Sequence, residues 1–156
     1  MIDLGTWNLS IPVGSPPTTI ETKQLLQGYD DKYFTSGSSN ISFWAPVTGA
    51  KTANAIYPRT ELRETWSNGT LHNWTYTEAD NFLNAKLKVI QVPSSGRIVI
   101  GQIHVYESTQ PLLKLEYQYQ DATKDGIVVA KVRFHPDDKK PRIFTIAEGI
   151  HLNETF

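Results

Sequence analysis

Two arginines and a glutamate alternate along a short segment near the middle of the chain. Arg59, Glu61 and Arg63 fall on one face of any strand that residues 57–64 form, because strand side chains alternate with a period of two. A guanidinium group binds a carboxylate through two parallel hydrogen bonds and stays charged at any working pH. The segment therefore predicts a surface that binds anions, with Glu61 holding both arginines in place. The alternative is an ion-pair ladder on a solvated sheet face, and the pattern alone favours this alternative.

A glutamine and a histidine share one face of a second segment. The largely apolar residues 97–101 lead into Gln102 and His104. These two side chains point the same way because of the same period of two, with Ile103 opposite. An amide can donate a neutral hydrogen bond, and an imidazole can take up a proton near neutral pH. The pair is a candidate for acid–base chemistry, although a single histidine is more often a structural or surface residue.

Composition limits the classes of function. The 156 residues suit one domain, residues 1–156, and the balance of 15 basic against 16 acidic side chains gives no field that would recruit nucleic acid or an acidic membrane. The chain has no cysteine, which excludes disulfides, thiolate metal sites and a cysteine nucleophile. It also has neither histidine pairs at metal-ligand spacing nor a calcium-loop pattern. We therefore expect no metal, no cofactor and no membrane-spanning segment.

Strands must position these residues. Apolar and polar residues alternate over residues 83–89, 113–120 and 128–134, between turn-forming clusters, which is typical of antiparallel sheets with one buried face. One short helix is expected at residues 22–27. The regular alternation of strands and turns predicts an all-β protein with a jelly-roll β-sandwich. Residues 153–156 end where another strand could start, so we expect a domain that lacks its last strands.

The sequence Arg-Thr-Glu-Leu-Arg-Glu at residues 59–64, followed by Gln-Ile-His at residues 102–104, resembles the first two signature motifs of the alginate lyases of polysaccharide lyase family 7. Residues 2–12 and 41–47 are similar to the opening strand of the family and to the segment before its first motif. The third motif of the family, Tyr-Phe-Lys-Ala-Gly-x-Tyr-x-Gln, carries a catalytic tyrosine and has no match in residues 1–156.

The resemblance implies a concanavalin-like jelly roll that cleaves alginate, a 1,4-linked uronate polymer, by β-elimination without a metal or organic cofactor. It makes three residues catalytic and gives two others supporting or substrate-binding roles: Arg59, Gln102 and His104, and Glu61 and Arg63, respectively. The tyrosine that acts as acid or base would come from a segment beyond this sequence or from a second chain that completes the fold. The expected partner is an anionic polysaccharide, not nucleic acid or a membrane.

Two other functions stay open at this point. A non-catalytic carbohydrate-binding module or lectin could use the same sandwich, because a fold does not fix a function. A purely structural β-domain explains the two motifs least well. Five of the eight asparagines lie in Asn-x-Ser/Thr triplets, which weakly favours a secreted protein. An extracellular or periplasmic location is therefore the expectation, although the sequence shows no signal peptide.

Overall fold

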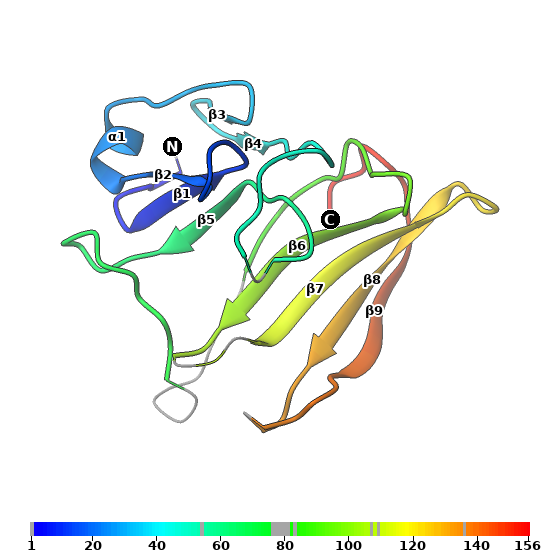
Figure 1. Ribbon diagram of the computed structural model, residues 1–156. Helices are drawn as coiled ribbons and strands as arrows, with labels where there is room; N and C mark the ends of the chain where they lie inside the picture. Colours follow the sequence, from blue (N-terminus) through cyan, green and yellow to red (C-terminus); the bar gives the residue numbers. More distant parts are fainter. Residues whose placement is uncertain are drawn as a thin grey trace. The chain divides into compact units, whose positions relative to one another are not determined.

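Antiparallel strands make up nearly all of the regular structure (Figure 1). The computed structural model describes residues 2–53, 55–75, 82, 84–106, 108, 110–135 and 137–156. By its internal contacts the chain divides into two compact units, Met1–Asn73 and Trp74–Phe156. The expectation of one domain over residues 1–156 stays a prediction.

Among the described residues, the first unit has two small sheets and one short helix. Its elements are β1 (Trp7–Ile11), β2 (Thr18–Ile20), α1 (Thr22–Leu26), β3 (Phe34–Ser36), β4 (Ile41–Phe43) and β5 (Glu61–Glu64). β1 lies between β2 and β5 in one sheet, and β3 pairs with β4 in the other. The helix agrees with the prediction for residues 22–27 to within one residue. In the described part of the chain, no helix is long and apolar enough to cross a membrane.

Burial determines which face of β5 carries its charged residues. Leu9 of β1 is fully buried, and its partner across the ladder is Leu62 of β5, which packs against the same core cluster. Because strand side chains alternate, Glu61 and Arg63 on either side of Leu62 must point to the opposite face. The apolar contact of one leucine thus orients two ionisable side chains.

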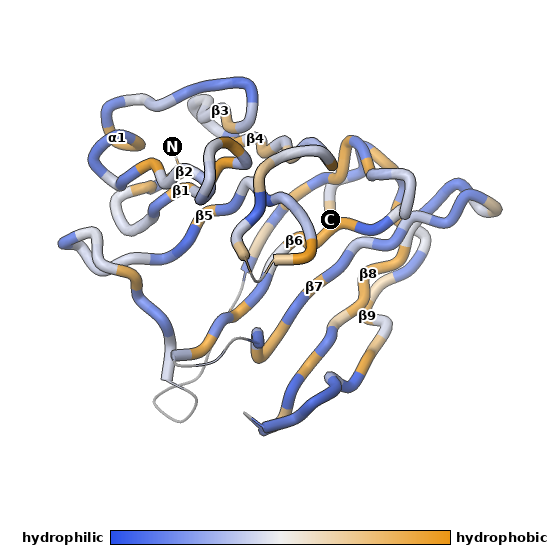
Figure 2. The backbone as a smooth tube through the Cα atoms, in the orientation of Figure 1, coloured by the Kyte–Doolittle hydropathy of each residue, from blue (hydrophilic) through white to orange (hydrophobic). Residues whose placement is uncertain are grey.

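The second unit is built on a four-stranded sheet. Its strands are β6 (Arg97–His104), β7 (Pro111–Gln120), β8 (Asp125–Val132) and β9 (Arg142–Ile150), and they neighbour one another in sequence order. All three pairings are antiparallel. Apolar and polar residues alternate along these strands (Figure 2). The strand predicted at residues 113–120 is confirmed by β7.

The apolar face of this sheet is centred on one buried tyrosine. Tyr117 of β7 lies opposite Ile98 of β6 and Val128 of β8, and it has no exposed surface. Its hydroxyl donates a hydrogen bond of 2.9 Å to the carbonyl oxygen of Ile150, at the end of β9. One side chain therefore links all four strands of the sheet. The close approach of its ring to Gly126 of β8 leaves no room for a side chain there, since an added Cβ would lie 2.5 Å from the tyrosine oxygen.

The polar face is ordered by a buried carboxylate. Glu116 of β7 is only 6% exposed, and its two oxygens lie 2.7 Å from Nζ of Lys131 and 3.2 Å from Nζ of Lys114. The side-chain amide of Gln118 donates to the same carboxylate at 3.2 Å. Burial acts to raise the pKa of Glu116, but the hydrogen bonds and charges of Lys131 and Lys114 outweigh burial, so this pKa lies below the ordinary carboxyl value. The fold therefore favours the ionised form.

The strand predicted at residues 83–89 is wrong for the part that the structure describes. Leu83 lies outside the described residues, and the remainder of the segment has no strand assignment. Leu87 nevertheless exchanges two backbone hydrogen bonds of 3.0 Å with Phe156. The segment is extended as the alternation predicts, but its partner is a short irregular stretch, and a continuous ladder needs a regular partner strand.

The strand predicted at residues 128–134 is displaced. β8 begins earlier, at Asp125, and ends at Val132, so Phe134 lies outside it and is 47% exposed. The backbone N–H of Phe134 donates to the side chain of Asp138 at 2.9 Å. This turn ends the strand, although the alternation of apolar and polar residues continues in the sequence.

Replacement of Gly126 by alanine should destabilise the fold. The new methyl group would overlap the Tyr117 ring, and overpacking of this kind typically lowers the free energy of unfolding by about 1–3 kcal/mol. The measurement is urea unfolding followed by circular dichroism. Gly5→Ala is the control, because its added Cβ would meet only the flexible side chain of Asp3, at 3.0 Å. Equal stability of Gly126→Ala and wild type would contradict the packing of the ring over residue 126.

Replacement of Glu116 by glutamine should change how stability depends on pH. Because the folded pKa is lowered, the stabilisation by ionised Glu116 is complete above the unfolded pKa and is lost as pH falls through the folded pKa. At neutral pH we expect Glu116→Gln to be less stable by roughly 1.5–3 kcal/mol, the range for hydrogen bonds to charged groups.

The difference between Glu116→Gln and wild type should shrink in acid, where both side chains are neutral. Unfolding free energies of the two proteins from pH 7 down to pH 2 test this, with Glu148→Gln as the control because Glu148 of β9 is exposed. A difference that stays constant over this range would show that the carboxylate charge contributes nothing.

Candidate active site

An ion pair joins the first arginine of the charged segment to the glutamate. Nη1 of Arg59 lies 3.1 Å from Oε1 of Glu61, and the two side chains are 37% and 23% exposed. A half-buried ion pair of this kind fixes the direction of the guanidinium group while leaving its other donors at the surface. Arg59 is thus held in place by Glu61.

The charged segment is a strand only in its second half. Residues 57–60 precede β5, and the ladder with β1 ends at the pair of Glu61 and Ser10. Continued pairing would bring Arg59 opposite Pro12, which has no backbone N–H to donate. Thr60 is held instead by a hydrogen bond of 2.6 Å from its hydroxyl to the carbonyl oxygen of Trp44. The ion pair, and not the strand ladder, therefore brings Arg59 beside Glu61.

Arg63 lies within β5 and is half-buried. Its ladder partner is Asn8, whose side-chain oxygen accepts from the backbone N–H and the hydroxyl of Thr22 at 2.9 and 3.0 Å. Among the residues that the structure describes, none forms a hydrogen bond or ion pair with the Arg63 guanidinium group. Five N–H donors are consequently available to an anion on this face.

Gln102 and His104 close β6, and both are half-buried. The register of β6 with β7 shifts between Ile103 and His104, where the extra residue lies on β7, so the alternation within β6 is kept. Nδ1 of His104 lies 3.3 Å from the carbonyl oxygen of Val105. In the tautomer that donates this hydrogen bond, Nε2 carries the lone pair and can accept a proton.

Gln102 is in line with two lysines on the polar face. Its ladder partner on β7 is Lys114, and the partner of Lys114 on β8 is Lys131. Both lysines hold the buried Glu116, so the amide of Gln102 lies next to an ordered cationic row. Alternation in the sequence predicts that Lys114 and Glu116 lie on the solvent-facing side of their strand, but it indicates no role for them. Alternation within one strand does not reveal the register between strands.

The structure brings each motif together within its own unit. Arg59, Glu61 and Arg63 belong to the first unit, and Gln102 and His104 belong to the second. In the first unit the charged residues share a short segment at the edge of the sheet. In the second unit the amide and the imidazole share the polar face at the end of β6. The first set can bind a carboxylate, and the second set can donate a hydrogen bond and accept a proton.

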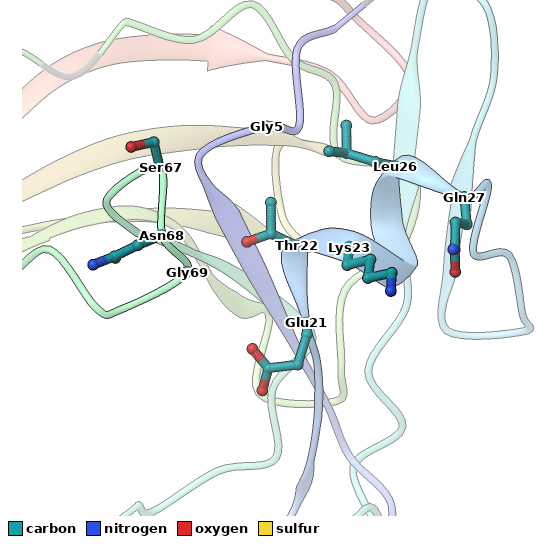
Figure 3. Close-up of a pocket in the computed structure, with 9 residues that line it drawn as sticks. All are labelled: Gly5, Glu21, Thr22, Lys23, Leu26, Gln27, Ser67, Asn68 and Gly69. Carbon is teal, nitrogen blue, oxygen red and sulfur yellow. The ribbon is translucent and has the colours of Figure 1, made fainter.

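A surface hollow in the first unit does not involve these residues. It has a volume of about 410 Å³ and lies at the start of α1 and the loop after β5 (Figure 3). Its lining includes Glu21, Lys23 and Asn68, and none of the predicted site residues. A smaller hollow in the second unit, of about 180 Å³, has an apolar lining that includes Leu115 and Phe156. The predicted site residues therefore lie outside both hollows.

Comparison with protein families and solved structures gives a consistent result. The family model described as alginate lyase matches residues 2–156. The alginate lyase PA1167 of Pseudomonas aeruginosa is 46% identical with a TM-score of 0.91, over 99% of this chain and 70% of that one. The alginate lyase A1-II′, a member of polysaccharide lyase family 7, is 30% identical with a TM-score of 0.76, over 99% of this chain and 67% of that one.

Further structures extend the comparison. The alginate lyase of Klebsiella pneumoniae is 24% identical with a TM-score of 0.80, over 99% of this chain and 71% of that one, and it supports the fold alone. Variants of A1-II′ altered at a tyrosine, or at a tyrosine and a histidine, were solved with the product GGG and the substrate GGMG, respectively. The comparison with curated proteins gave no match.

These matches confirm the all-β jelly-roll prediction and the resemblance on which it partly rested. Both motif segments lie inside the matched residues. The lectin or binding-module alternative gains no support from them. The chain belongs to the alginate lyase family, polysaccharide lyase family 7.

Proposed function

We propose that the protein cleaves alginate by β-elimination, with Arg59, Gln102 and His104 in the catalytic roles that the family motifs imply. The observation that carries the proposal is the guanidinium group of Arg59, fixed 3.1 Å from Glu61, in a family member that also presents Gln102 and His104 on one strand face. The substrate class follows from the family and from the complexes of A1-II′ with GGG and GGMG. Arg63 adds a second cationic group on the same strand as Glu61.

The reaction breaks the C5–H and C4–O4 bonds of the sugar, forms a C4=C5 double bond and returns a proton to O4. The obstacle is the weak acidity of C5 beside an ionised carboxylate. Donors from Arg59 and Gln102 to that carboxylate stabilise the negative charge that spreads into it as the proton leaves. This electrostatic stabilisation is the part of the chemistry that the two motif segments supply.

Proton transfer needs a base at C5 and an acid at O4. His104 serves as the base when the sugar places its C5 proton on the imidazole side, and Nε2 is the acceptor when Nδ1 donates to the carbonyl oxygen of Val105. The family resemblance assigns the acid at O4 to the tyrosine of the third family motif, which residues 1–156 do not contain. The scheme requires no metal or organic cofactor.

An extracellular or periplasmic location is part of the proposal, supported by the five Asn-x-Ser/Thr triplets of the sequence. The competing function is carbohydrate binding without cleavage. It is distinguished by the unsaturated sugar that only β-elimination leaves, which absorbs in the ultraviolet.

Loss of Arg59 or His104 should lower the rate of alginate cleavage steeply. We expect Arg59→Ala to lower kcat/KM by roughly 100- to 1000-fold, as removal of a charge-stabilising donor does, and His104→Ala by roughly 100- to 10000-fold, as removal of a general base does. The assay is the ultraviolet absorbance of unsaturated product from alginate.

Two matched variants control for nonspecific effects of removing a cation or an imidazole. Arg142 and His135 are exposed and lie outside the motif segments, so Arg142→Ala and His135→Ala should keep wild-type activity. All four variants should unfold at the wild-type temperature. Full activity of Arg59→Ala or His104→Ala would contradict the site assignment, whereas binding of alginate by a wild type that makes no unsaturated product would favour the binding module.

A further inference from the structure

Three residues form a straight row across the polar face of the second unit. Gln102 of β6, Lys114 of β7 and Lys131 of β8 are direct partners across two consecutive ladders. Neighbouring strands lie about 4.8 Å apart, so the row runs perpendicular to the strands and moves one strand further from Gln102 at each step. On β9 the row ends at the apolar Ile143. The cationic part of the row is therefore the part that adjoins Gln102.

Glu116 fixes both lysines without neutralising both. It lies two residues after Lys114 on the same face of β7, and one carboxylate oxygen accepts from each ammonium group, at 3.2 Å for Lys114 and 2.7 Å for Lys131. Two ammonium groups and one carboxylate leave one positive charge in excess. The lowered pKa of Glu116 keeps the carboxylate ionised, so this arrangement persists at neutral pH.

The lysines also keep donors for a ligand. An ammonium group has three N–H donors, and Glu116 accepts from one of them on each lysine. Side-chain exposures of 31% for Lys114 and 19% for Lys131 show that both side chains reach the surface. Because the carboxylate restrains them, the lysines lose less conformational entropy on binding than free surface lysines would. A preorganised pair of cations suits a ligand with repeated negative charges.

We propose that Lys114 and Lys131 bind the carboxylates of two further uronate residues, on one side of the uronate at Gln102. The polymer then crosses β6, β7 and β8 perpendicular to the strands. This inference rests on the proposed function, since it places the reacting uronate at Gln102. It makes the two lysines substrate-binding residues and Glu116 a positioning residue. The ligand class is a chain of ionised uronates, and a neutral polysaccharide has nothing for the row to bind.

Lys114→Met is the decisive variant. Methionine keeps much of the apolar stem, and the shorter contact of Lys131 with Glu116, 2.7 Å, remains, so the fold should persist. We expect KM for polymeric alginate to rise about tenfold with kcat nearly unchanged, because the lost contact acts equally in the ground state and the transition state. Lys131→Met should behave in the same way, and Lys114→Arg should recover most of the loss.

The matched controls are Lys86→Met and Lys88→Met, exposed lysines of the same unit that lie outside the sheet. They remove the same charge and should leave KM unchanged. An unchanged KM in folded Lys114→Met, with wild-type activity present, would overturn the inference and leave the proposed function standing.

A binding readout separates the two claims. In the His104→Ala background, migration through a gel containing alginate should be retarded, and Lys114→Met should reduce the retardation, whereas a gel containing dextran should retard neither protein. If the wild type makes no unsaturated product while retardation still depends on Lys114, cleavage fails as the function and the uronate row is supported. Retardation that is equal with and without Lys114 contradicts the row, whatever the wild-type activity.

Discussion

The register between β6 and β7 decides which side chains of the second unit can act together, because a slip of one residue would move Gln102 from the polar face to the apolar face. Apolar packing fixes this register. Tyr117 is fully buried opposite Ile98 and Val128, and its hydroxyl reaches the carbonyl oxygen of Ile150 on β9. On the other face Glu116 of β7 binds Lys131 of β8. Apolar packing thus aligns β6 with β7, and apolar packing and a buried carboxylate together align β7 with β8.

Local charge, rather than the field of the whole protein, explains how an anionic polymer could be held by a chain of net charge −1. The first unit offers Arg59 and Arg63 with one glutamate, and the second offers two lysines with one glutamate. Glu61 orders Arg59 in the first unit, Glu116 orders both lysines in the second, and each set of residues has one positive charge in excess. The acidic residues elsewhere on the surface keep the total balanced. Capture of the substrate is therefore expected to depend on contact and to weaken with salt.

Sequence periodicity predicted the elements that carry long, regular alternation. β7 agrees with its predicted range, and the short helix at residues 22–27 agrees because Glu21 and Gln24 cap it, with Gly28 just beyond its end. Periodicity failed where the described residues include no regular partner strand, as at Leu87, which exchanges backbone hydrogen bonds with Phe156. Alternation within one segment does not indicate which segment lies beside it. An extended segment becomes a strand only when a neighbouring strand pairs with it.

The candidate site, like the fold, could be predicted from the sequence only in part. Alternation within β5 and β6 predicted that Glu61 and Arg63 share a face, and likewise Gln102 and His104, and the resemblance supplied their roles. Arg59 joins Glu61 by an ion pair before the strand begins, which alternation does not describe. The row of Gln102 with Lys114 and Lys131 required the pairing register of three strands. Register arises from tertiary packing, so a reading of each segment by itself could not find it.

The central claim is that Arg59 and Gln102 both bind uronate carboxylates of the substrate. A crystal structure of the protein, as the His104→Asn variant bound to an alginate tetrasaccharide, tests it most directly. The account predicts that carboxylates of the tetrasaccharide accept hydrogen bonds of about 2.7–3.2 Å from Arg59 and from Gln102. A tetrasaccharide whose carboxylates contact only one of these residues, or neither, would contradict it.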